Sequence, residues 1–218
     1  MQHLASRFDL TRVPMAGASG GALCAVLARC GVDPEVVTES AYQLSLDHNI
    51  WERPLGLVGV WGRIIEAWLG QLLPEDAAER CSGGLGVVVT RLPSCRQELI
   101  EEYESKEDLI NCCMASAHVP LLLDLKISRR LRGAKCVDGS FPDFFTNENS
   151  PYLLRGGALV FDYFHDPNIV RNGRMDMLQL KEYSELKKIV RLGAHYAQRL
   201  EEEGAFEPYD LEPVLKKA

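Results

Sequence analysis

The 218-residue sequence contains no C-x-x-C pair, no histidines at metal-ligand spacing and no block of lysines and arginines. Without ligands at a suitable spacing, neither a metal site nor a cofactor is expected. The net charge of −7 argues against nucleic acid as a partner, because binding to phosphates requires clustered positive charge. The composition, with 46% hydrophobic and 25% charged residues, is ordinary for a globular protein and leaves the oligomeric state unknown.

A basic-then-apolar leader and a long uninterrupted apolar run are also missing. The most apolar stretch, residues 55–73, carries Arg63, Glu66 and interior glycines, which make it a poor membrane-spanning helix. We therefore expect an intracellular protein, in the cytoplasm or peripheral to a membrane or lipid droplet. The seven cysteines are then expected to be reduced, buried thiols, with the adjacent Cys112 and Cys113 filling the core.

The most informative stretch is Gly17-Ala18-Ser19-Gly20-Gly21-Ala22-Leu23, which reads G-x-S-x-G. A short extended run precedes it and an apolar helical run follows. Strand, sharp turn and helix in this order are the context of a nucleophile elbow. The glycines allow the strained turn, and Ser19 would lie at its tip, beside a helix N-terminus that favours negative charge. A turn that merely joins a strand to a helix is the structural alternative.

Strand and helix patterns alternate along the rest of the chain. Strands are predicted at residues 85–90, 134–137 and 157–161. Helices are predicted at residues 34–47, 55–73, 74–81, 105–115 and 175–203. This alternation predicts an α/β layered fold with a mostly parallel sheet.

Asp138 is the candidate partner for Ser19, because a serine hydroxyl is a poor nucleophile until a base takes its proton. The segment Cys136-Val137-Asp138-Gly139-Ser140 follows a predicted strand and turns at a glycine. Such a turn would aim the carboxylate outward at the strand end, where α/β folds build their sites. We therefore expect the two side chains within hydrogen-bond reach, about 2.6–3.2 Å. Asp-Gly is also a common turn dipeptide that carries no chemistry.

Taken in order, these motifs resemble those of the patatin-like phospholipases. The matching features are G-A-S-G-G-A-L at 17–23, the strand and loop at 87–92, S-K-E-D-L-I at 105–110, A-S-x-x-V-P at 115–120 and V-D-G at 137–139. The resemblance covers roughly residues 8–165 and implies a three-layer α/β/α sandwich. It also implies a serine acyl hydrolase of phospholipid or acylglycerol esters that forms an acyl-enzyme intermediate, without a cofactor.

Carried over residue by residue, the resemblance makes Ser19 the nucleophile and Asp138 the general base of a dyad without histidine. Gly17, Gly21 and Gly139 are the glycines of the two motifs, and the N–H group of Gly20 is a candidate oxyanion donor. The partner implied is a lipid ester, presented at a lipid or membrane surface.

Two features depart from the family pattern. The family carries a G-x-G-x-x-G oxyanion loop some tens of residues before the serine, whereas sixteen residues precede Gly17. We therefore expect a partial hydrolase domain at 1–174, lacking its first strand and this loop, followed by a C-terminal helix and tail at 175–218. Low turnover is expected, because one oxyanion donor contributes ~10²–10³ in rate. Poor solubility is expected, because a missing strand exposes unpaired backbone and apolar surface. Ser140 in place of alanine or glycine is the milder departure.

Two other interpretations remain open. A Ser–Asp–His triad would add His165 or His195, although a conventional α/β-hydrolase needs several strands before the elbow. A catalytically impaired or non-catalytic relative could instead serve as a lipid-surface or partner-binding module.

The stretch at 55–73 is a candidate for contact with lipid. An amphipathic helix there would turn Trp61 or Trp68 toward a pocket, solvent or lipid. A buried core helix is the competing interpretation, because tryptophan is highly buried on average.

Overall fold

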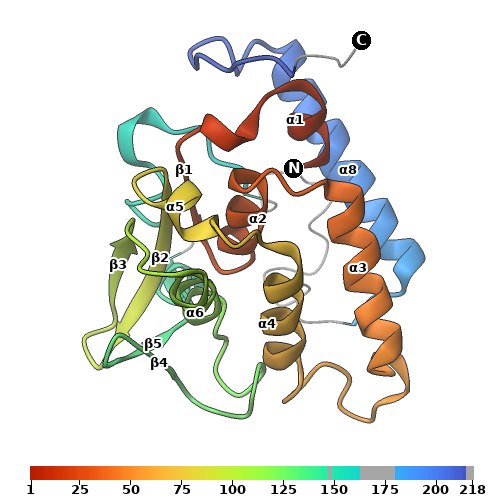
Figure 1. The fold of residues 1–218 in the computed structure, drawn as a ribbon, viewed down its shortest axis with the longest axis vertical. Helices are drawn as coiled ribbons and strands as arrows, with labels where there is room; N and C mark the ends of the chain where they lie inside the picture. Colours follow the sequence, from red (N-terminus) through yellow and green to blue (C-terminus); the bar gives the residue numbers. More distant parts are fainter. Residues whose placement is uncertain (147–148, 163–179, 215–218) are drawn as a thin grey trace.

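The computed structural model describes residues 1–146, 149–162 and 180–214 as a mixed α/β fold (Figure 1). The helices and strands are α1 (Gln2–Arg7), η1 (Leu10–Arg12), β1 (Met15–Ala18), α2 (Gly20–Arg29), α3 (Pro34–Asp47), η2 (Ile50–Glu52), α4 (Trp61–Leu72), α5 (Ala77–Cys81), β2 (Leu85–Leu92), β3 (Arg96–Ile100), α6 (Lys106–Ser116), β4 (Arg129–Leu131), β5 (Ala134–Val137), α7 (Asp143–Thr146), η3 (Arg155–Gly157) and α8 (Tyr183–Glu202).

β2 is the central strand of the sheet. Along one side it pairs with β3, antiparallel, over residues 87–91. Along its other side it pairs with β1, parallel, over residues 85–88, and then with β5, antiparallel, over residues 90–92. β4 completes the sheet by pairing with β5. β1 and β5 therefore lie end to end beside the same strand.

The sheet is mixed, which corrects the expectation of a mostly parallel one. Among the described strands only β1 and β2 pair in parallel. The β2–β3 and β4–β5 pairs are hairpins, and β5 joins the second hairpin to β2 in antiparallel orientation, an arrangement that the strand–helix alternation does not reveal. In the β4–β5 hairpin the two-residue loop is Arg132-Gly133, with φ of 49° and 80°. Two left-handed residues in succession are the geometry of the tight turn that joins antiparallel strands.

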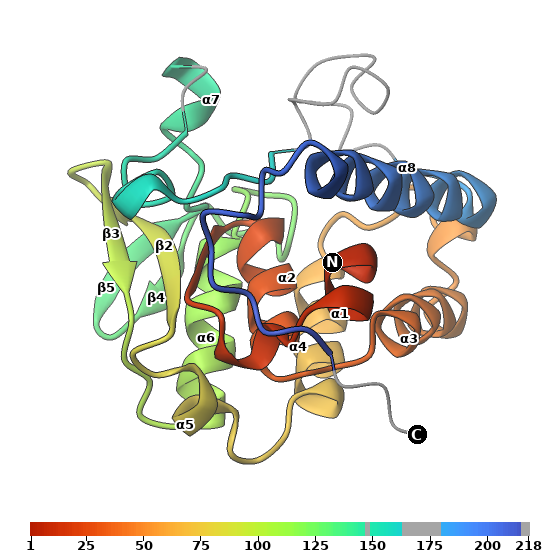
Figure 2. The same ribbon diagram turned by 90° about the horizontal axis from the view of Figure 1, so that it is seen from above.

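The helices cover the sheet from one side in the views of Figures 1 and 2. α2 and α6 pack on the strands, α4 packs on α6, and α3 packs on α4. α8 runs beside α1 at the outer side of this helical layer (Figure 2). The described residues therefore do not form the expected three-layer sandwich.

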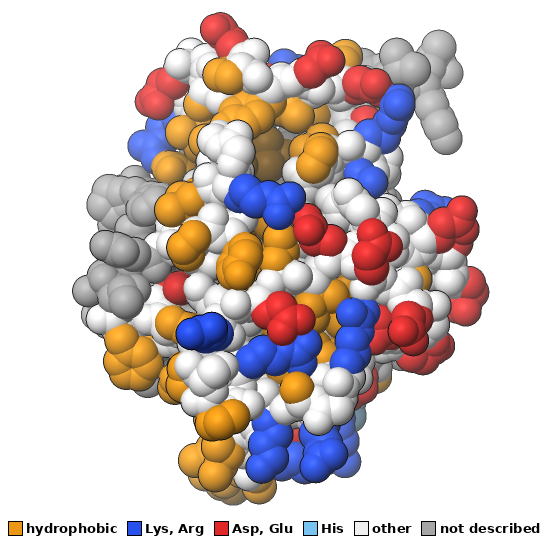
Figure 3. Space-filling view, turned by 90° about the vertical axis from the view of Figure 1, so that its left-hand side faces the viewer, with side chains coloured by type: hydrophobic (Ala, Val, Ile, Leu, Met, Phe, Trp, Pro, Cys, Tyr) orange, Lys and Arg blue, Asp and Glu red, His pale blue; other side chains and the backbone are white. Residues whose placement is uncertain are grey.

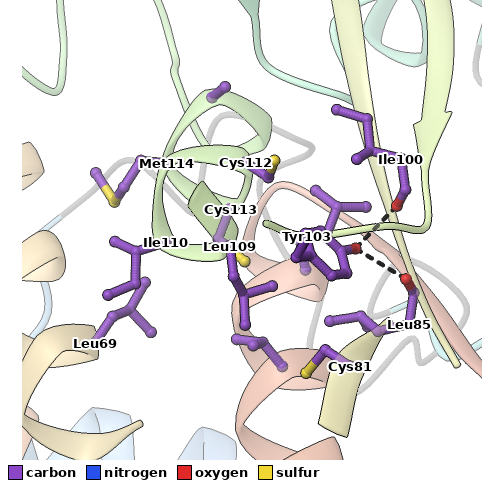
Figure 4. Packing of buried hydrophobic residues seen from close by; sticks show 14 of the residues in the cluster. Leu69, Cys81, Leu85, Ile100, Tyr103, Leu109, Ile110, Cys112, Cys113 and Met114 are labelled. Atoms are coloured by element: carbon purple, nitrogen blue, oxygen red, sulfur yellow. Dashed lines mark hydrogen bonds between the residues drawn. The ribbon is translucent and has the colours of Figure 1, made fainter. Parts of the chain in front are cut away.

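The hydrophobic core lies between the sheet and helices α2, α4 and α6. Figure 4 shows Tyr103 between α6 and the strands, where the phenol donates to the carbonyl oxygens of Leu85 and Ile100 at 2.8 and 2.9 Å. Because the hydroxyl has partners, the ring can be buried without leaving a polar group unsatisfied.

The cysteines are all free thiols, and most of them are buried. Cys112 and Cys113 are fully buried in the core, as predicted, and burial raises the pKa of Cys112 to about 12. Cys24 and Cys95 are exposed, which corrects the expectation that all seven would be buried.

Several predicted boundaries shift where glycines adopt positive φ. Residues 157–161 form no strand, because Gly156 and Gly157 have φ of 69° and 73° and the segment after them has no regular structure. The predicted helix at 55–73 begins only at Trp61, after turns at Gly56 and Gly59. The last helix begins at Tyr183, and residues 175–179 of its predicted range lie outside the described residues.

The tryptophans of α4 favour the core interpretation of this helix. Trp61 and Trp68 are half-buried and pack against the core cluster. The indole N–H of Trp68 donates to Ser40 Oγ at 2.9 Å, which ties α4 to α3. Among the described residues, no helix combines the length and the apolar character needed to cross a membrane.

Candidate active site

Ser19 occupies a strained turn between β1 and α2. Its φ and ψ are 54° and −130°, a region that non-glycine residues seldom adopt. The backbone can turn this sharply because Gly17 has no side chain: a Cβ there would lie 2.5 Å from the backbone of Gly21. Strand, strained serine and helix thus follow each other as the G-x-S-x-G motif predicts.

The register of the sheet explains how Ser19 meets Asp138. β1 ends with Ala18 opposite Val88, and β5 ends with Val137 opposite Thr90. One step further along each strand, both chains reach the level of Val89 from opposite directions. Ser19 and Asp138 therefore converge at the gap between the ends of β1 and β5. Because they are far apart in the sequence, the sequence does not show this geometry.

The two side chains are in direct contact. Ser19 Oγ donates to Asp138 Oδ2 at 2.7 Å, within the predicted distance. Asp138 is 1% exposed, and its other carboxylate oxygen accepts from the Ser140 N–H at 2.8 Å. Burial raises the pKa of Asp138 to about 6, against the lowering effect of these two hydrogen bonds. The carboxylate can thus hold or release a proton near neutral pH.

Ser116, the last residue of α6, connects the two turns. Its hydroxyl donates to the Val88 carbonyl at 2.6 Å and accepts the backbone N–H of Ser19 at 3.0 Å. Its own carbonyl accepts the N–H of Gly139 at 2.8 Å. Sequence reasoning used Ser116 only as part of the A-S-x-x-V-P match. Its partner Ser19 lies 97 residues away, so no local signal could have given this role.

Replacing Ser116 by Ala should slow covalent modification of Ser19 by about 10–10²-fold, because small displacements of a reacting group are costly. The unpaired Val88 carbonyl should also lower the free energy of unfolding by ~1–3 kcal/mol. Labelling with a fluorophosphonate and urea unfolding measure the two effects.

Ser105→Ala is the matched control for this change. It removes the N-cap of α6, where the side chain accepts the Asp108 N–H, at a cost of ~1 kcal/mol. Labelling of the control should stay at the wild-type rate. A Ser116→Ala protein that labels as fast as this control would refute the positioning role.

Two further polar side chains hold the Asp-Gly turn, the buried Thr90 and the half-buried Gln97. Thr90 donates from its hydroxyl to the Asp138 carbonyl at 2.8 Å. Gln97 donates from its amide to the Gly139 carbonyl and to Asp143 Oδ1, each at 2.9 Å. Because both come from strands of the sheet, they fix the turn relative to the β2–β3 pair.

The N-terminus of α2 faces an open region. A Cβ added at Gly20 or at Gly21 would find no heavy atom within 4 Å, and both residues are exposed. The first N–H groups of a helix have no partner within it. Within the part of the chain that the structure describes, no backbone hydrogen bond uses the N–H groups of Gly20 and Gly21.

The histidines contribute no side chain to this pair within the described residues. His118 is 1% exposed and directs its ring toward the Lys126 carbonyl, while its own carbonyl accepts the Asp138 N–H. His195 is exposed on α8. His165, the other histidine of the hypothetical triad, lies outside the described residues. No group of three or more His, Cys, Asp or Glu in the described part of the chain could hold a metal ion.

Comparisons with known proteins point to one family. The chain is 31% identical to the human omega-hydroxyceramide transacylase over 147 residues, which are 65% of this chain and 26% of that protein. It is 35% identical over 81 residues to human patatin-like phospholipase domain-containing protein 2, covering 37% of this chain and 16% of that protein. Human patatin-like phospholipase domain-containing protein 4 is 29% identical over 166 residues, covering 74% of this chain and 60% of that protein. No protein-family model matches.

These similarities support a relationship to patatin-like phospholipase domain proteins. The chain spans about a quarter of the length of the transacylase that it matches.

Proposed function

We propose that the chain is a serine acyl hydrolase or acyltransferase of lipid esters that uses a Ser19–Asp138 dyad. The observation that carries this proposal is the 2.7 Å hydrogen bond from the strained serine to a buried carboxylate. Burial raises the pKa of Asp138 toward neutrality, which makes its ionised form less stable. An aspartate with only a structural role gains nothing from this shift, whereas a general base does. The similarity to patatin-like proteins supports lipid esters as the substrate class.

In the proposed reaction, Ser19 Oγ attacks the ester carbonyl while Asp138 Oδ2 takes the hydroxyl proton. The tetrahedral intermediate carries its negative charge on the former carbonyl oxygen. The N–H groups of Gly20 and Gly21, at the positive end of the α2 dipole, are the donors that can face this charge. Collapse of the intermediate expels the alcohol, which takes the proton from Asp138 and leaves an acyl-Ser19 ester.

The acyl-enzyme can be resolved in two ways with the same groups. Asp138 takes a proton from water, or from the hydroxyl of a second lipid, and that oxygen attacks the acyl carbon. Water gives a free fatty acid, whereas a lipid alcohol gives a new ester. The transacylase among the relatives makes the second outcome a specific alternative for this chain.

The proposal is tested by labelling with a fluorophosphonate, which requires an activated serine but no lipid surface. Wild-type protein should label and Ser19→Ala should not. The rate should rise with pH through about 6 and level off above it, because only ionised Asp138 accepts a proton. Below this midpoint the rate should fall about tenfold per pH unit.

Ser94→Ala removes a serine in the exposed β2–β3 turn and serves as the matched control. It should label at the wild-type rate. Equal labelling of the Ser19→Ala protein would refute the assignment. A radiolabelled acyl donor, supplied with and without a lipid alcohol, then distinguishes hydrolysis from transfer.

A further inference from the structure

Four large aliphatic side chains are exposed on two neighbouring loops. In the loop after α6, Leu121, Leu125 and Ile127 are 56%, 63% and 68% exposed. In the loop before α4, Leu55 is 67% exposed. Clusters of exposed aliphatic residues mark binding surfaces more often than isolated ones do.

Two of these leucines are also in an unfavourable backbone conformation. Leu121 and Leu125 have φ of 67° and 62°, the left-handed region that costs a non-glycine residue free energy. Burial does not compensate for this cost, because both side chains face solvent. Asn or Gly would fit the same backbone better, so folding alone does not account for leucine at these positions.

The two loops form one ordered unit. The N–H groups of Gly59 and Gly62 donate to the carbonyls of Leu122 and Leu123 at 2.8 and 3.0 Å. Leu123 is 2% exposed and anchors the second loop in the core. Within that loop the Leu121 N–H donates to the Lys126 carbonyl at 2.8 Å. The exposed side chains are therefore presented on a fixed backbone.

Positive charge gathers on these loops and on the adjoining elements, which are the first turn of α4 and the β4–β5 hairpin. We call residues 53–63 and 119–135 together the loop pair. In a chain of net charge −7, the loop pair holds one acidic residue, Asp124, and seven basic ones: Arg53, Arg63, Lys126, Arg129, Arg130, Arg132 and Lys135. Arg63, Arg130 and Lys135 are exposed and form no ion pair with the residues that the structure describes. Figure 3 shows hydrophobic and basic side chains together at the lower end of the molecule.

We propose that the loop pair docks the protein onto an anionic lipid surface. The aliphatic side chains would enter the boundary between headgroups and acyl chains, and the cations would lie against the headgroup charge. The second loop starts directly after His118, whose carbonyl accepts the N–H of Asp138. Docking would thus hold the dyad close to the lipid. The inference deepens the proposed function, although vesicle binding itself does not require Ser19.

The test is flotation with vesicles of phosphatidylcholine, with and without phosphatidylserine. Wild-type protein should bind the mixed vesicles more strongly, and Ser19→Ala should bind as wild type does. The double variant Leu121→Asn, Leu125→Asn should lose roughly 100-fold in partitioning, from two buried leucines. Its melting temperature should stay the same or rise, because Asn tolerates the left-handed conformation. Arg130→Gln with Lys135→Gln should lose roughly tenfold or more on mixed vesicles only.

The matched control is Val36→Asn, Leu186→Asn, two exposed aliphatic residues on α3 and α8 outside the loop pair. It should bind vesicles as wild type does. Equal loss in this control, or equal binding to neutral and anionic vesicles, would overturn the proposal. The proposal would also be overturned if the Leu121→Asn, Leu125→Asn variant bound vesicles fully but lost a dimer on gel filtration. In that case a second copy of the chain, and not lipid, would bind the loop pair. If Ser19 fails to label while the vesicle results hold, only the proposed catalysis is wrong.

Discussion

Replacing Asp138 by Asn should lower the rate of fluorophosphonate labelling of Ser19 by about 10³-fold, within the range that a general base contributes. The amide is nearly isosteric and can keep the hydrogen bond from the Ser140 N–H, so the site should retain its shape. It cannot accept the serine proton. The variant should therefore label slowly at every pH, without the rise through about pH 6 expected of wild type, so that the difference between the two is full above pH 6 and shrinks below it.

The same substitution should make the protein more stable at neutral pH. The folded-state pKa of Asp138 is about 6, above its ordinary value of 3.8. The protonated carboxyl therefore stabilises the fold fully below pH 3.8, and this contribution is lost as the pH rises through 6. By linkage, the ionised form costs on the order of 2–3 kcal/mol at pH 8. Asn removes this cost, so urea unfolding should show a gain at pH 8 and little difference at pH 4.

His195→Ala is the control for chemistry at the dyad. His195 is exposed on α8 and makes no described hydrogen bond to Ser19 or Asp138. Labelling should be unchanged by its removal. A loss comparable to that of Asp138→Asn, in a protein with an unchanged melting temperature, would restore the triad hypothesis.

Local sequence signals were sufficient to locate the candidate site. The helix at Pro34–Asp47 starts as predicted because Asp33 caps it through the Glu35 N–H, and Ser105 caps α6 in the same way. β5 has the predicted bounds, because its end is marked by the Asp-Gly turn. The strained serine follows from the glycines around it. Each of these features depends on residues that are neighbours in the chain.

Pairing across the sheet could not be predicted in the same way. The sequence pattern indicates which residues form β1 and β5, but not that both lie beside β2 with their ends facing each other. Hairpin geometry depends on turn dihedral angles such as those of Arg132 and Gly133. The positioning roles of Ser116, Thr90 and Gln97 could not be predicted either. Their hydroxyl and amide groups form hydrogen bonds with turns that are distant in sequence.

The exposed loop leucines illustrate a different limit. In sequence, residues 121–127 form a mainly apolar stretch after Pro120, and nothing shows which leucines face inward. The structure buries Leu123 and exposes Leu121 and Leu125 at positive φ. The hydrogen bond from the Gly62 N–H to the Leu123 carbonyl, together with packing of Leu123 in the core, determines which leucines are buried. The lipid-facing role expected for the tryptophans of α4 is therefore proposed for the loops beside that helix.

Gly139→Ala is expected to be the most destabilising substitution around the site. A Cβ at this position would overlap the carbonyl group of Val88 and come within 3.1 Å of Ser116 Oγ. Neither neighbour can move freely. Val88 is fully buried in the central strand and is paired with Ala18 on one side and Leu99 on the other. The Ser116 hydroxyl is held by the Val88 carbonyl and by the Ser19 N–H.

The free energy of unfolding should consequently fall by about 4 kcal/mol or more, a large part of the 5–15 kcal/mol that a typical domain possesses. Gly21→Ala is the matched control in the other motif. A Cβ there meets no atom within 4 Å, and alanine favours a helix over glycine by ~1 kcal/mol. Its urea midpoint should stay the same or rise. A Gly139→Ala protein with a wild-type urea midpoint would mean that the Asp-Gly turn lies further from β2 than the structure shows. The geometry of the Ser19–Asp138 pair would then be wrong as well.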